Sequence, residues 1–308
     1  MGFDPFSEES DSYVDVNGDV VRAEDATVSI FDRNFLYGDG VFESMPVYEG
    51  KMLMCDRHLD RLFRSLKAVQ MSFPLARGEL VSRMRRVASK SDLEYGSIRV
   101  MVSRGQGPPG VVNADRVSDP TVVVVPQPSA EGEVAYGRDV PATGSARIVS
   151  TRAIQPDSVD SKVKSHNYLV NVLAERELVG TDADFGIMLD HDGYVAEEFV
   201  SNVFIRDEDG TFRTPPTTHA LAGITRELVM EVGSERGEMV VESRLTPYDL
   251  YTAEDVFVTA SARGIASLVE LNGQPIGDGE QSQAVIDLAR ATFDYALNNE
   301  FTPIADDD

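Results

Sequence analysis

Alternating and periodic apolar positions divide the first part of the chain into short elements. Residues 13–21 (YVDVNGDVV) alternate around Asn17 and Gly18, a dipeptide typical of tight hairpins, and so predict two short strands. Residues 56–71 (DRHLDRLFRSLKAVQM) repeat apolar positions every three to four residues, which predicts a helix. Its buried face consists of Leu59, Leu62, Phe63, Leu66 and Val69. Residues 97–105 (SIRVMVSRG) and 120–128 (PTVVVVPQP) are typical of strands.

The second part of the chain mixes strands and helices. We expect a strand at 146–151 (ARIVST) and helices at 165–180 (SHNYLVNVLAERELVG), at the start of 223–237 (GITRELVMEVGSERG) and at 282–300 (SQAVIDLARATFDYALNNE). Residues 184–216 carry short apolar runs between Asp-Gly turns, which predicts an antiparallel meander. Residues 254–273 (EDVFVTASARGIASLVELNG) predict two strands around a tight turn.

This order of elements predicts a mixed α and β fold in two unequal domains, without the regular βαβ alternation of a doubly wound sheet. The expected parts are a loose tail at 1–12, a small N-terminal α/β domain at 13–127, a linker rich in Pro and Gly at 128–144, and a large C-terminal domain at 145–308.

The composition fits a folded and strongly acidic protein. Apolar residues make up 42% of the 308 residues, and the formal net charge is −24. Nucleic acid and anionic membrane surfaces would repel such a chain, so we expect neither as a partner. Because arginine largely replaces lysine, the acidity indicates a salt-adapted, halophilic surface. The few lysines are Lys51, Lys67, Lys90, Lys162 and Lys164.

The same sequence predicts a soluble cytoplasmic protein. Cys55 is the one cysteine, so no disulfide can form within the chain. The N-terminus (MGFDPFSEES) has no basic and apolar export signal, and no window reaches the roughly 18 apolar residues of a membrane helix. The four histidines show no metal-ligand spacing, so no metal site is expected.

Two of the rare lysines, Lys162 and Lys164, stand just before the helix predicted at 165–180. A lysine there suits covalent catalysis, because its amine can form a Schiff base with a carbonyl cofactor when its pKa is lowered, and the positive helix end favours that. Arginine could not replace it, because arginine does not lose its proton.

Pyridoxal phosphate is a carbonyl cofactor that needs an anionic partner for its ring nitrogen and hydrogen-bond donors for its phosphate. Glu197, near the end of a predicted strand, offers the carboxylate. Gly223 with the amides of Ile224 and Thr225 opens a helix, which is an anion site. Arg61 offers a guanidinium for the phosphate.

Seven segments together resemble the class IV pyridoxal-phosphate aminotransferases. They are FDRNFLYGDGVFES, RHLDRL, KSHNYL, AEEFVSNVF, TPP, LAGITR and DLYTAEDVFVTASA, and they run in the order and spacing of that family from about Tyr13 to beyond Asn272. The family contains branched-chain aminotransferases, D-amino-acid aminotransferases and aminodeoxychorismate lyase. The resemblance implies a two-domain fold type IV enzyme like D-amino-acid aminotransferase, a bound pyridoxal 5'-phosphate and a homodimer.

The resemblance also implies roles for single residues. Lys164 would be the Schiff-base lysine and proton shuttle, while Lys162 has no family role. The cofactor would be bound by Arg61 (phosphate), Tyr168 (phenolic oxygen), Glu197 (ring nitrogen), Leu221 (ring face), Gly223, Ile224 and Thr225 (phosphate) and Ser261 (phosphate turn). The substrate would be bound by Tyr37, Phe42, Arg99, Ser261 and Ala262.

Departures from the family pattern bear on the substrate. Glu198, Phe199 and Val200 replace small residues after Glu197, and Pro46 stands where the family often has arginine. In the loop SRGQGPPGVV, Pro109 takes the place of the carboxylate-trapping arginine that D-amino-acid aminotransferases and the lyase tend to carry. Val111 takes the place of the polar residue that follows that arginine in the family pattern.

Taken with Arg99 and an apolar pocket, the loop favours an enzyme of branched-chain amino acid biosynthesis. It would move the amino group of a branched-chain L-amino acid to 2-oxoglutarate by a ping-pong mechanism. A D-amino-acid aminotransferase, an aminodeoxychorismate lyase and a decayed cofactor-binding protein stay as alternatives.

Overall fold

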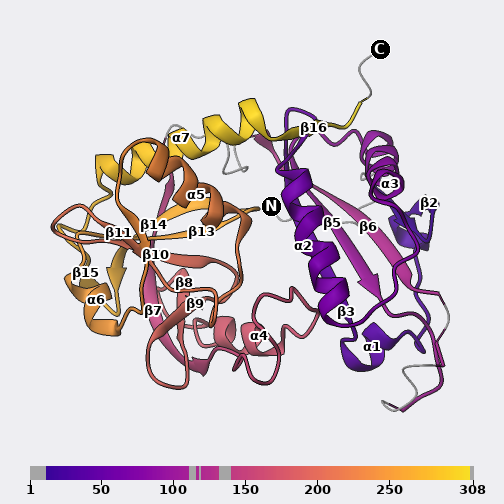
Figure 1. The fold of residues 1–308 in the computed structure, drawn as a ribbon, viewed down its shortest axis with the longest axis horizontal. Coiled ribbons are helices and arrows are strands. Elements are labelled where there is room, and N and C mark those ends of the chain that lie inside the picture. Colours follow the sequence, from indigo (N-terminus) through magenta and orange to yellow (C-terminus); the bar gives the residue numbers. More distant parts are fainter. Residues whose placement is uncertain (1–11, 111–115, 118, 132–139, 306–308) are drawn as a thin grey trace. The chain divides into compact units, whose positions relative to one another are not determined.

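The computed structural model describes residues 12–110, 116–117, 119–131 and 140–305 (Figure 1). Most of the predicted tail, Val111 and the middle of the predicted linker lie outside these residues. Contacts divide the chain into two compact units, each with a sheet of its own. The first comprises Met1–Val134, Val163–Asn167 and Leu297–Asp308, and the second comprises Ala135–Lys162 and Tyr168–Ala296. The domain boundaries expected from the sequence stay predictions.

The first unit is built on a seven-stranded, wholly antiparallel sheet in the order β16-β4-β3-β5-β6-β1-β2. Its strands are β1 (Tyr13–Val16), β2 (Asp19–Arg22), β3 (Gly40–Tyr48), β4 (Lys51–Leu53), β5 (Gly96–Ser103), β6 (Thr121–Pro128) and β16 (Phe301–Pro303). Its helices are the short η1 (Ala23–Asp25), α1 (Arg33–Tyr37), α2 (Cys55–Ala68) and α3 (Arg77–Lys90).

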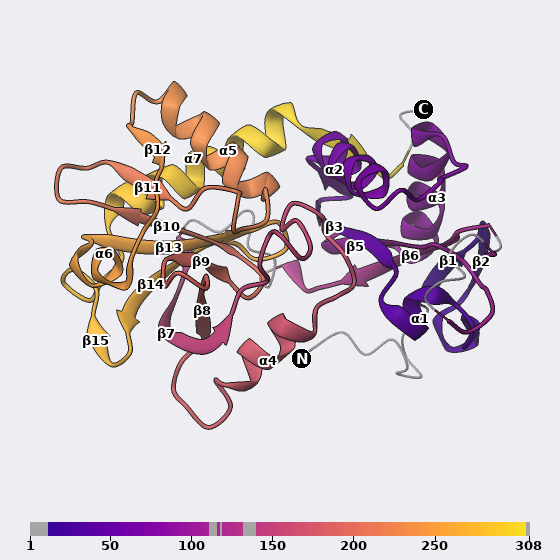
Figure 2. The ribbon, with the colours of Figure 1, turned by 60° about the horizontal axis from the view of Figure 1, so that its bottom comes forward.

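Helices α2 and α3 cover one face of this sheet, as Figure 2 shows. Successive strand residues point to opposite faces, so alternate residues of β3 enter the core beneath the helices. Val41, Met45 and Val47 of β3 pack there with Leu59 and Leu62 of α2, and all five are fully buried. The opposite face carries Phe42, which is important for the site.

The second unit is built on a nine-stranded mixed sheet in the order β12-β11-β10-β13-β14-β7-β8-β9, with β15 paired to β14. Its strands are β7 (Ala142–Arg152), β8 (Phe185–Leu189), β9 (Val195–Glu198), β10 (Asn202–Arg206), β11 (Phe212–Thr214), β12 (Val240–Glu242), β13 (Asp255–Ala260), β14 (Gly264–Leu271) and β15 (Gln274–Pro275). Its helices are α4 (Leu169–Arg176), α5 (Ile224–Glu235), α6 (Pro247–Thr252) and α7 (Gln283–Asn299), whose last residues cluster with the first unit.

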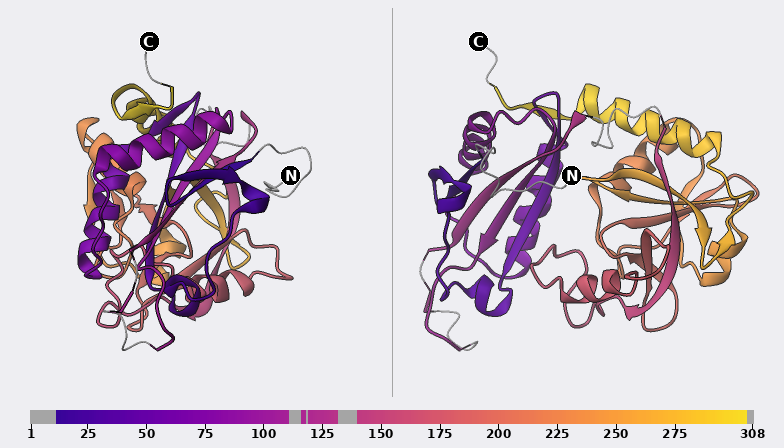
Figure 3. Two further views of the ribbon diagram at one scale, coloured as in Figure 1. Left: turned by 90° about the vertical axis from the view of Figure 1, so that its right-hand side faces the viewer. Right: turned by 180° about the vertical axis from the view of Figure 1, so that it is seen from behind.

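Both faces of the second sheet are covered. Ala266 and Leu268 of β14 enter one apolar cluster, which Leu250 of α6 joins. Their neighbour Ile265 points to the opposite face, where α5 and α7 pack (Figure 1). Helix α4 packs through Ala174 against β7, the long magenta strand in the right-hand view of Figure 3. The strand ends of this sheet carry the candidate site residues of the second unit.

Most elements predicted from the apolar pattern are confirmed. The Asn17–Gly18 hairpin is β1 and β2, the amphipathic helix is α2, and the last predicted helix is α7. The helix predicted at 165–180 is wrong at its start, because α4 begins only at Leu169. The preceding backbone is taken up instead by β3, where the amide of His166 donates to the carbonyl oxygen of Gly40.

Candidate active site

Lys164 lies on a short extended segment that adds to β3. Val41 and Ser165 form an antiparallel bridge, and the amide of Phe42 donates to the carbonyl oxygen of Lys164 at 2.9 Å. On the other side the amide of Lys164 donates to Oγ of Ser65 in α2 at 3.3 Å. The lysine is therefore fixed by backbone hydrogen bonds, and α4 begins only at Leu169.

Three polar side chains contact the ring of Phe42 on the face of the sheet that α2 does not cover. The Nζ of Lys164 lies 4.7 Å from its ring centroid, and the Cζ of Arg99 lies 4.0 Å from it. The imidazole of His166 stacks on the ring at 5.1 Å. Since cations are attracted to aromatic faces, the ring favours this arrangement. The structure thus brings together the predicted residues Lys164, Phe42 and Arg99.

His166 was not among the residues predicted from the sequence. Burial, and then the nearby charge of Arg99, lower the pKa of His166 to about 4, so the ring is neutral at pH 7. Gly40 leaves room for it, because a Cβ on Gly40 would lie 2.7 Å from its Nδ1. A histidine beside a candidate lysine in KSHNYL was the available signal.

Tyr37, which was also predicted to bind the substrate, contacts the loop before residue 111. The amide of Gly110 donates to its hydroxyl at 2.5 Å, and the guanidinium of Arg33 lies 5.0 Å from its ring centroid. Arg33 also donates to the carbonyl oxygen of Gly110 at 3.5 Å. The loop residue Pro109 is exposed. Helix α1 therefore holds the loop that carries Pro109.

Arg61 lies on the opposite face from Phe42, inside the core beneath α2. Its Nε and Nη2 donate to the two carboxylate oxygens of Glu43 at 2.7 and 2.8 Å. Nδ1 of His58 lies 2.8 Å from the same carboxylate. Glu43 and His58 are fully buried and Arg61 is 4% exposed. Arg61 was predicted from the sequence as a cofactor-binding residue, but its partner Glu43 was not predicted.

The charges of this cluster decide its protonation. Burial acts to raise the pKa of Glu43, but the charge of Arg61 and the hydrogen bonds of Arg61 and His58 outweigh it and hold that pKa well below the usual range. Burial lowers the pKa of His58; Glu43 opposes this, and Arg61 and Lys164 add to it. Glu43 is therefore ionised and His58 is neutral.

In the second unit, Glu197 and Leu221 are joined directly. The amide of Leu221 donates to Oε2 of Glu197 at 2.9 Å, and Nδ2 of Asn202 donates to the carbonyl oxygen of Leu221 at 2.9 Å. A Cβ on Gly223 would lie only 2.0 Å from Oδ1 of Asn202, so this position needs glycine. Asn202, in the quoted segment AEEFVSNVF, is a site residue that the sequence prediction left out.

Helix α5 begins directly after Gly223, as predicted. Ile224 and Thr225 are buried in its first turn, and no side chain caps this end. The hydroxyl of Thr225 donates to Oγ of Ser261 at 3.5 Å. Ser261 and Ala262 lie in the turn that joins β13 to β14. The helix end and the turn thus form one polar corner, which suits an anion.

The remaining predicted residues lie in α4's flank, β3 and the end of β9. Tyr168 precedes α4 and is half-buried. Of the residues that replace the family's small ones, Glu198 and Phe199 are buried and Val200 is 41% exposed. Pro46 is buried in β3, opposite Ser97 of β5.

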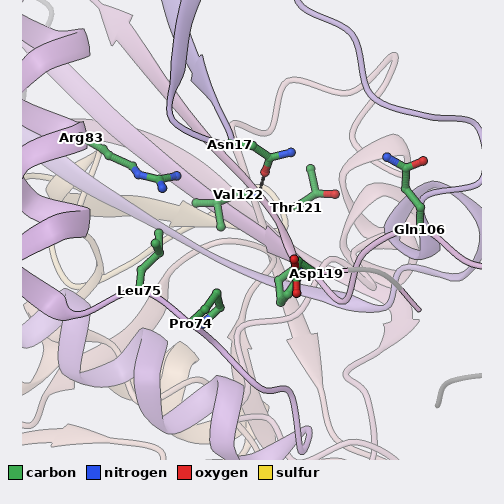
Figure 4. A pocket seen from close by; sticks show the side chains of 9 residues that line it. Asn17, Pro74, Leu75, Arg83, Gln106, Asp119, Thr121 and Val122 are labelled. Carbon is green, nitrogen blue, oxygen red and sulfur yellow. Dashed lines mark hydrogen bonds between the residues drawn. The ribbon is translucent and has the colours of Figure 1, made fainter. Parts of the chain in front are cut away.

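Two cavities contain none of these residues. One of about 380 Å³ in the first unit is lined by Asn17, Arg83, Asp119 and Thr121, among others (Figure 4). Its cation Arg83 is paired with Glu79 at 3.2 Å. The other, of about 200 Å³, lies beside Asp190 in the second unit.

Among the described residues, no group of three His, Cys, Asp or Glu side chains could hold a metal ion. None of the helices within those ranges combines the length and the apolar character needed to cross a bilayer.

These residues fit pyridoxal phosphate by their chemistry. The first unit contains a primary amine, Lys164, and the guanidinium of Arg61, two of whose donors are used by Glu43. The second unit contains the carboxylate of Glu197 and the start of α5, which no side chain caps. Carboxylate, amine and amide donors are the groups that this cofactor requires.

Comparisons with known proteins agree with this chemistry. The family model described as amino-transferase class IV matches residues 40–271. A proposed branched-chain-amino-acid aminotransferase of Methanocaldococcus jannaschii is 36% identical over 85% of this chain and 89% of its own. The aminodeoxychorismate lyase of Bacillus subtilis is 32% identical over 92% of this chain and 94% of its own.

A solved structure extends the likeness to the fold. A branched-chain amino acid aminotransferase from the organism abbreviated T.th., complexed with N-(5'-phosphopyridoxyl)-L-glutamate, superposes with a TM-score of 0.88 at 25% identity, over 96% of this chain and 99% of that one. The predictions of a mixed α and β fold type IV enzyme and of its cofactor are confirmed. This chain belongs to the class IV aminotransferases and is a pyridoxal-phosphate-dependent enzyme.

Proposed function

We propose that this enzyme is a branched-chain aminotransferase, which moves the amino group of L-leucine, L-isoleucine or L-valine to 2-oxoglutarate in a ping-pong reaction. The observation that carries the proposal is Pro109. It stands, on a loop tied to α1, where the D-specific enzymes and the lyase tend to have an arginine that traps a carboxylate. Without that arginine, Arg99 beside the ring of Phe42 is the group that supports binding of an L-substrate.

An apolar pocket with Tyr37 and Phe42 as its walls would suit an aliphatic side chain as the preferred substrate group. Pro46 is the counterweight, because it takes the place of a family arginine that would face the substrate. The likeness to a proposed branched-chain aminotransferase at 36% identity supports the branched-chain assignment.

We assign the residue roles as follows. Lys164 binds the cofactor covalently, Arg61 and the amides of Ile224 and Thr225 bind its phosphate, and Glu197 pairs with its ring nitrogen. Tyr168 donates to its phenolic oxygen, Leu221 packs on its ring, and Ser261 with Ala262 binds phosphate and the substrate carboxylate. Tyr37, Phe42 and Arg99 form the substrate pocket.

Bound pyridoxal phosphate supplies a carbonyl that takes up amino groups and a ring that accepts electron density. The chain supplies the proton transfers and the orientation. Nζ of Lys164 takes the proton from Cα of the amino donor. In the second half-reaction it gives a proton to Cα of the acceptor. Glu197, fixed by the amide of Leu221, keeps a negative charge at the ring nitrogen. Both act from positions held by backbone hydrogen bonds.

We also propose that the enzyme works as a cytoplasmic homodimer in a salt-rich cell. Ile30, Phe31 and Phe35 of the first unit are 65%, 50% and 70% exposed, which is unusual for large apolar side chains and favours a subunit interface. Light scattering coupled to size exclusion measures the mass directly, and a monomer at micromolar concentration would contradict the dimer.

A panel of amino donors tests the proposed substrate. With 2-oxoglutarate as acceptor, the branched-chain L-amino acids should react faster than D-alanine and D-glutamate, as followed by the absorbance of the cofactor in the half-reaction. Each methylene in an apolar pocket discriminates by about 1–3 kcal/mol, so the three good donors should differ modestly. Faster reaction with D-amino acids would refute the assignment.

The second candidate function is that of an aminodeoxychorismate lyase. It is favoured by the 32% identity to the Bacillus subtilis lyase over nearly the whole chain. Release of pyruvate from aminodeoxychorismate without an amino donor would establish it. No spectral response to any amino acid would instead favour a decayed site.

A further inference from the structure

Glu198 is a buried carboxylate that the proposed reaction does not use. It ends β9, next to Glu197, and its side chain is fully buried. Oε2 accepts a hydrogen bond from the amide of Val200 at 3.0 Å, while Oε1 has no hydrogen-bond partner among the described residues. Burial raises the pKa of Glu198, and the amide of Val200 and the charge of Arg263 oppose that shift. A carboxylate in such a place is costly unless a cation offsets it.

Arg263 is that cation, and it comes from the turn that carries Ser261 and Ala262. Its Nη1 lies 3.8 Å from Oε1 of Glu198. Its guanidinium lies 5.9 and 5.7 Å from the ring centroids of Phe185 and Phe199, which favours a cation there. The side chain is 48% exposed and touches no other carboxylate closely enough to form an ion pair in the described part of the chain.

The pair completes a triangle of contacts between three segments of the second unit. The end of β9 is joined to the loop before α5 by the hydrogen bond from Leu221 to Glu197. The start of α5 is joined to the β13–β14 turn by the hydrogen bond from Thr225 to Ser261. The ion pair of Arg263 with Glu198 joins that turn back to the end of β9. Without it, one side of the triangle is open.

We propose that Glu198 and Arg263 are a positioning pair that holds the Ser261–Ala262 turn against the end of β9, so that the turn is set to bind the substrate carboxylate and the cofactor phosphate. The inference rests on the roles proposed above for Ser261 and Ala262. Glu198 acts through Arg263, and neither residue takes part in proton transfer. The pair therefore affects binding much more than the chemical step.

Variants of both residues test the pair. Half-exposed ion pairs couple by up to about 1 kcal/mol, which is about fivefold in an equilibrium constant. In Glu198→Gln and in Arg263→Gln we expect the KM for the best amino donor of the panel, and the Kd of the apo-protein for pyridoxal phosphate, to rise about fivefold. The kcat should stay within about twofold of wild type, and the double variant should be no worse than either single one.

Two further variants separate positioning from general damage. Arg263→Lys keeps the charge and should recover most of the lost binding. Arg244→Gln is the matched control, because Arg244 is 45% exposed and pairs with Asp190 and Asp192 at 3.3 Å, away from the triangle. It should leave KM and Kd unchanged. Melting temperatures, measured by circular dichroism, should be alike in all variants.

Three outcomes would contradict the positioning role of Glu198 and Arg263. Unchanged KM and Kd in the single variants, additive losses in the double variant, or equal losses in Arg244→Gln would overturn it. If the wild type reacts with no amino donor, the proposed function fails, and the Kd for pyridoxal phosphate still decides the inference by itself.

Discussion

The ion pair of Arg61 with Glu43 places a fully buried carboxylate in the core of the first unit. In Glu43→Gln the side chain keeps its size but loses its charge, and its new NH2 group would face a donor of Arg61 or His58. Arg61, 4% exposed, would keep its charge but lose the carboxylate that accepts two of its hydrogen bonds. Removing one partner of a buried pair costs about 3–5 kcal/mol, so we expect that loss in the free energy of unfolding.

The assay is urea unfolding of the full chain, followed by circular dichroism because the chain contains no tryptophan. Glu79→Gln is the matched control: it is the same chemical change in the same unit, but Glu79 is 53% exposed and pairs with Arg83 on the surface. That control should lose less than about 1 kcal/mol. A loss in Glu43→Gln no larger than in the control would refute the argument from buried charge.

The same pair predicts a dependence on pH. The folded pKa of Glu43 is depressed, so its contribution to stability is fully present above the unfolded pKa of about 4.3 and is lost as the pH falls below it. The difference in unfolding free energy between wild type and Glu43→Gln should therefore be constant from about pH 6 to 8 and shrink below about pH 4. A difference that grows toward acid would have the wrong sign.

Three further predictions concern the cofactor site and the surface. Borohydride should fix the pyridoxyl group on Lys164; Lys164→Ala should lose it and the half-exposed Lys162→Ala should keep it, and a peptide label on Lys162 would contradict this. Gly223→Ala, whose Cβ would lie 2.0 Å from Oδ1 of Asn202, should disturb the start of α5 and weaken pyridoxal-phosphate binding about tenfold. Gly78→Ala, whose Cβ would have nothing within 4 Å, should not weaken it. Equal Kd values in the two variants would refute this prediction. With a net charge of −24, the melting temperature should rise from millimolar to molar sodium chloride, and equal values would leave the acidity unexplained.

Periodic apolar residues predicted some of the elements that bury one face, but α3 and the nine-residue β3 were not predicted. The stripe of Leu59, Leu62 and Leu66 gave α2, because a helix turns every 3.6 residues and only one of its faces meets the sheet. Short elements such as α1 and β4 were not predicted, since too few residues show a period. The start of α4 was predicted too early, because the backbone of His166 pairs with β3 and no local pattern reveals that partner.

The family motifs named candidate residues but not their partners. Glu197 and Leu221 were each predicted from a motif, and the structure shows the hydrogen bond between them. Glu43 lies in a quoted motif too, yet its pairing with Arg61 follows from β3 facing α2, which only the fold determines. The partner of Glu198 also comes from a distant turn. Contacts between remote segments are the part that sequence reasoning could not supply.

The pairing of β3 with the segment around Lys164 has a consequence for biosynthesis. A ribosome releases β3 long before residues 163–167, and it releases β16, the partner of β4, only at the end of the chain. The edge that β3 and β4 form in the sheet of the first unit therefore stays open while the second unit is made, and closing such long loops slows folding. Exposed edges invite pairing with other chains, so the nascent protein should depend on chaperones until β16 emerges.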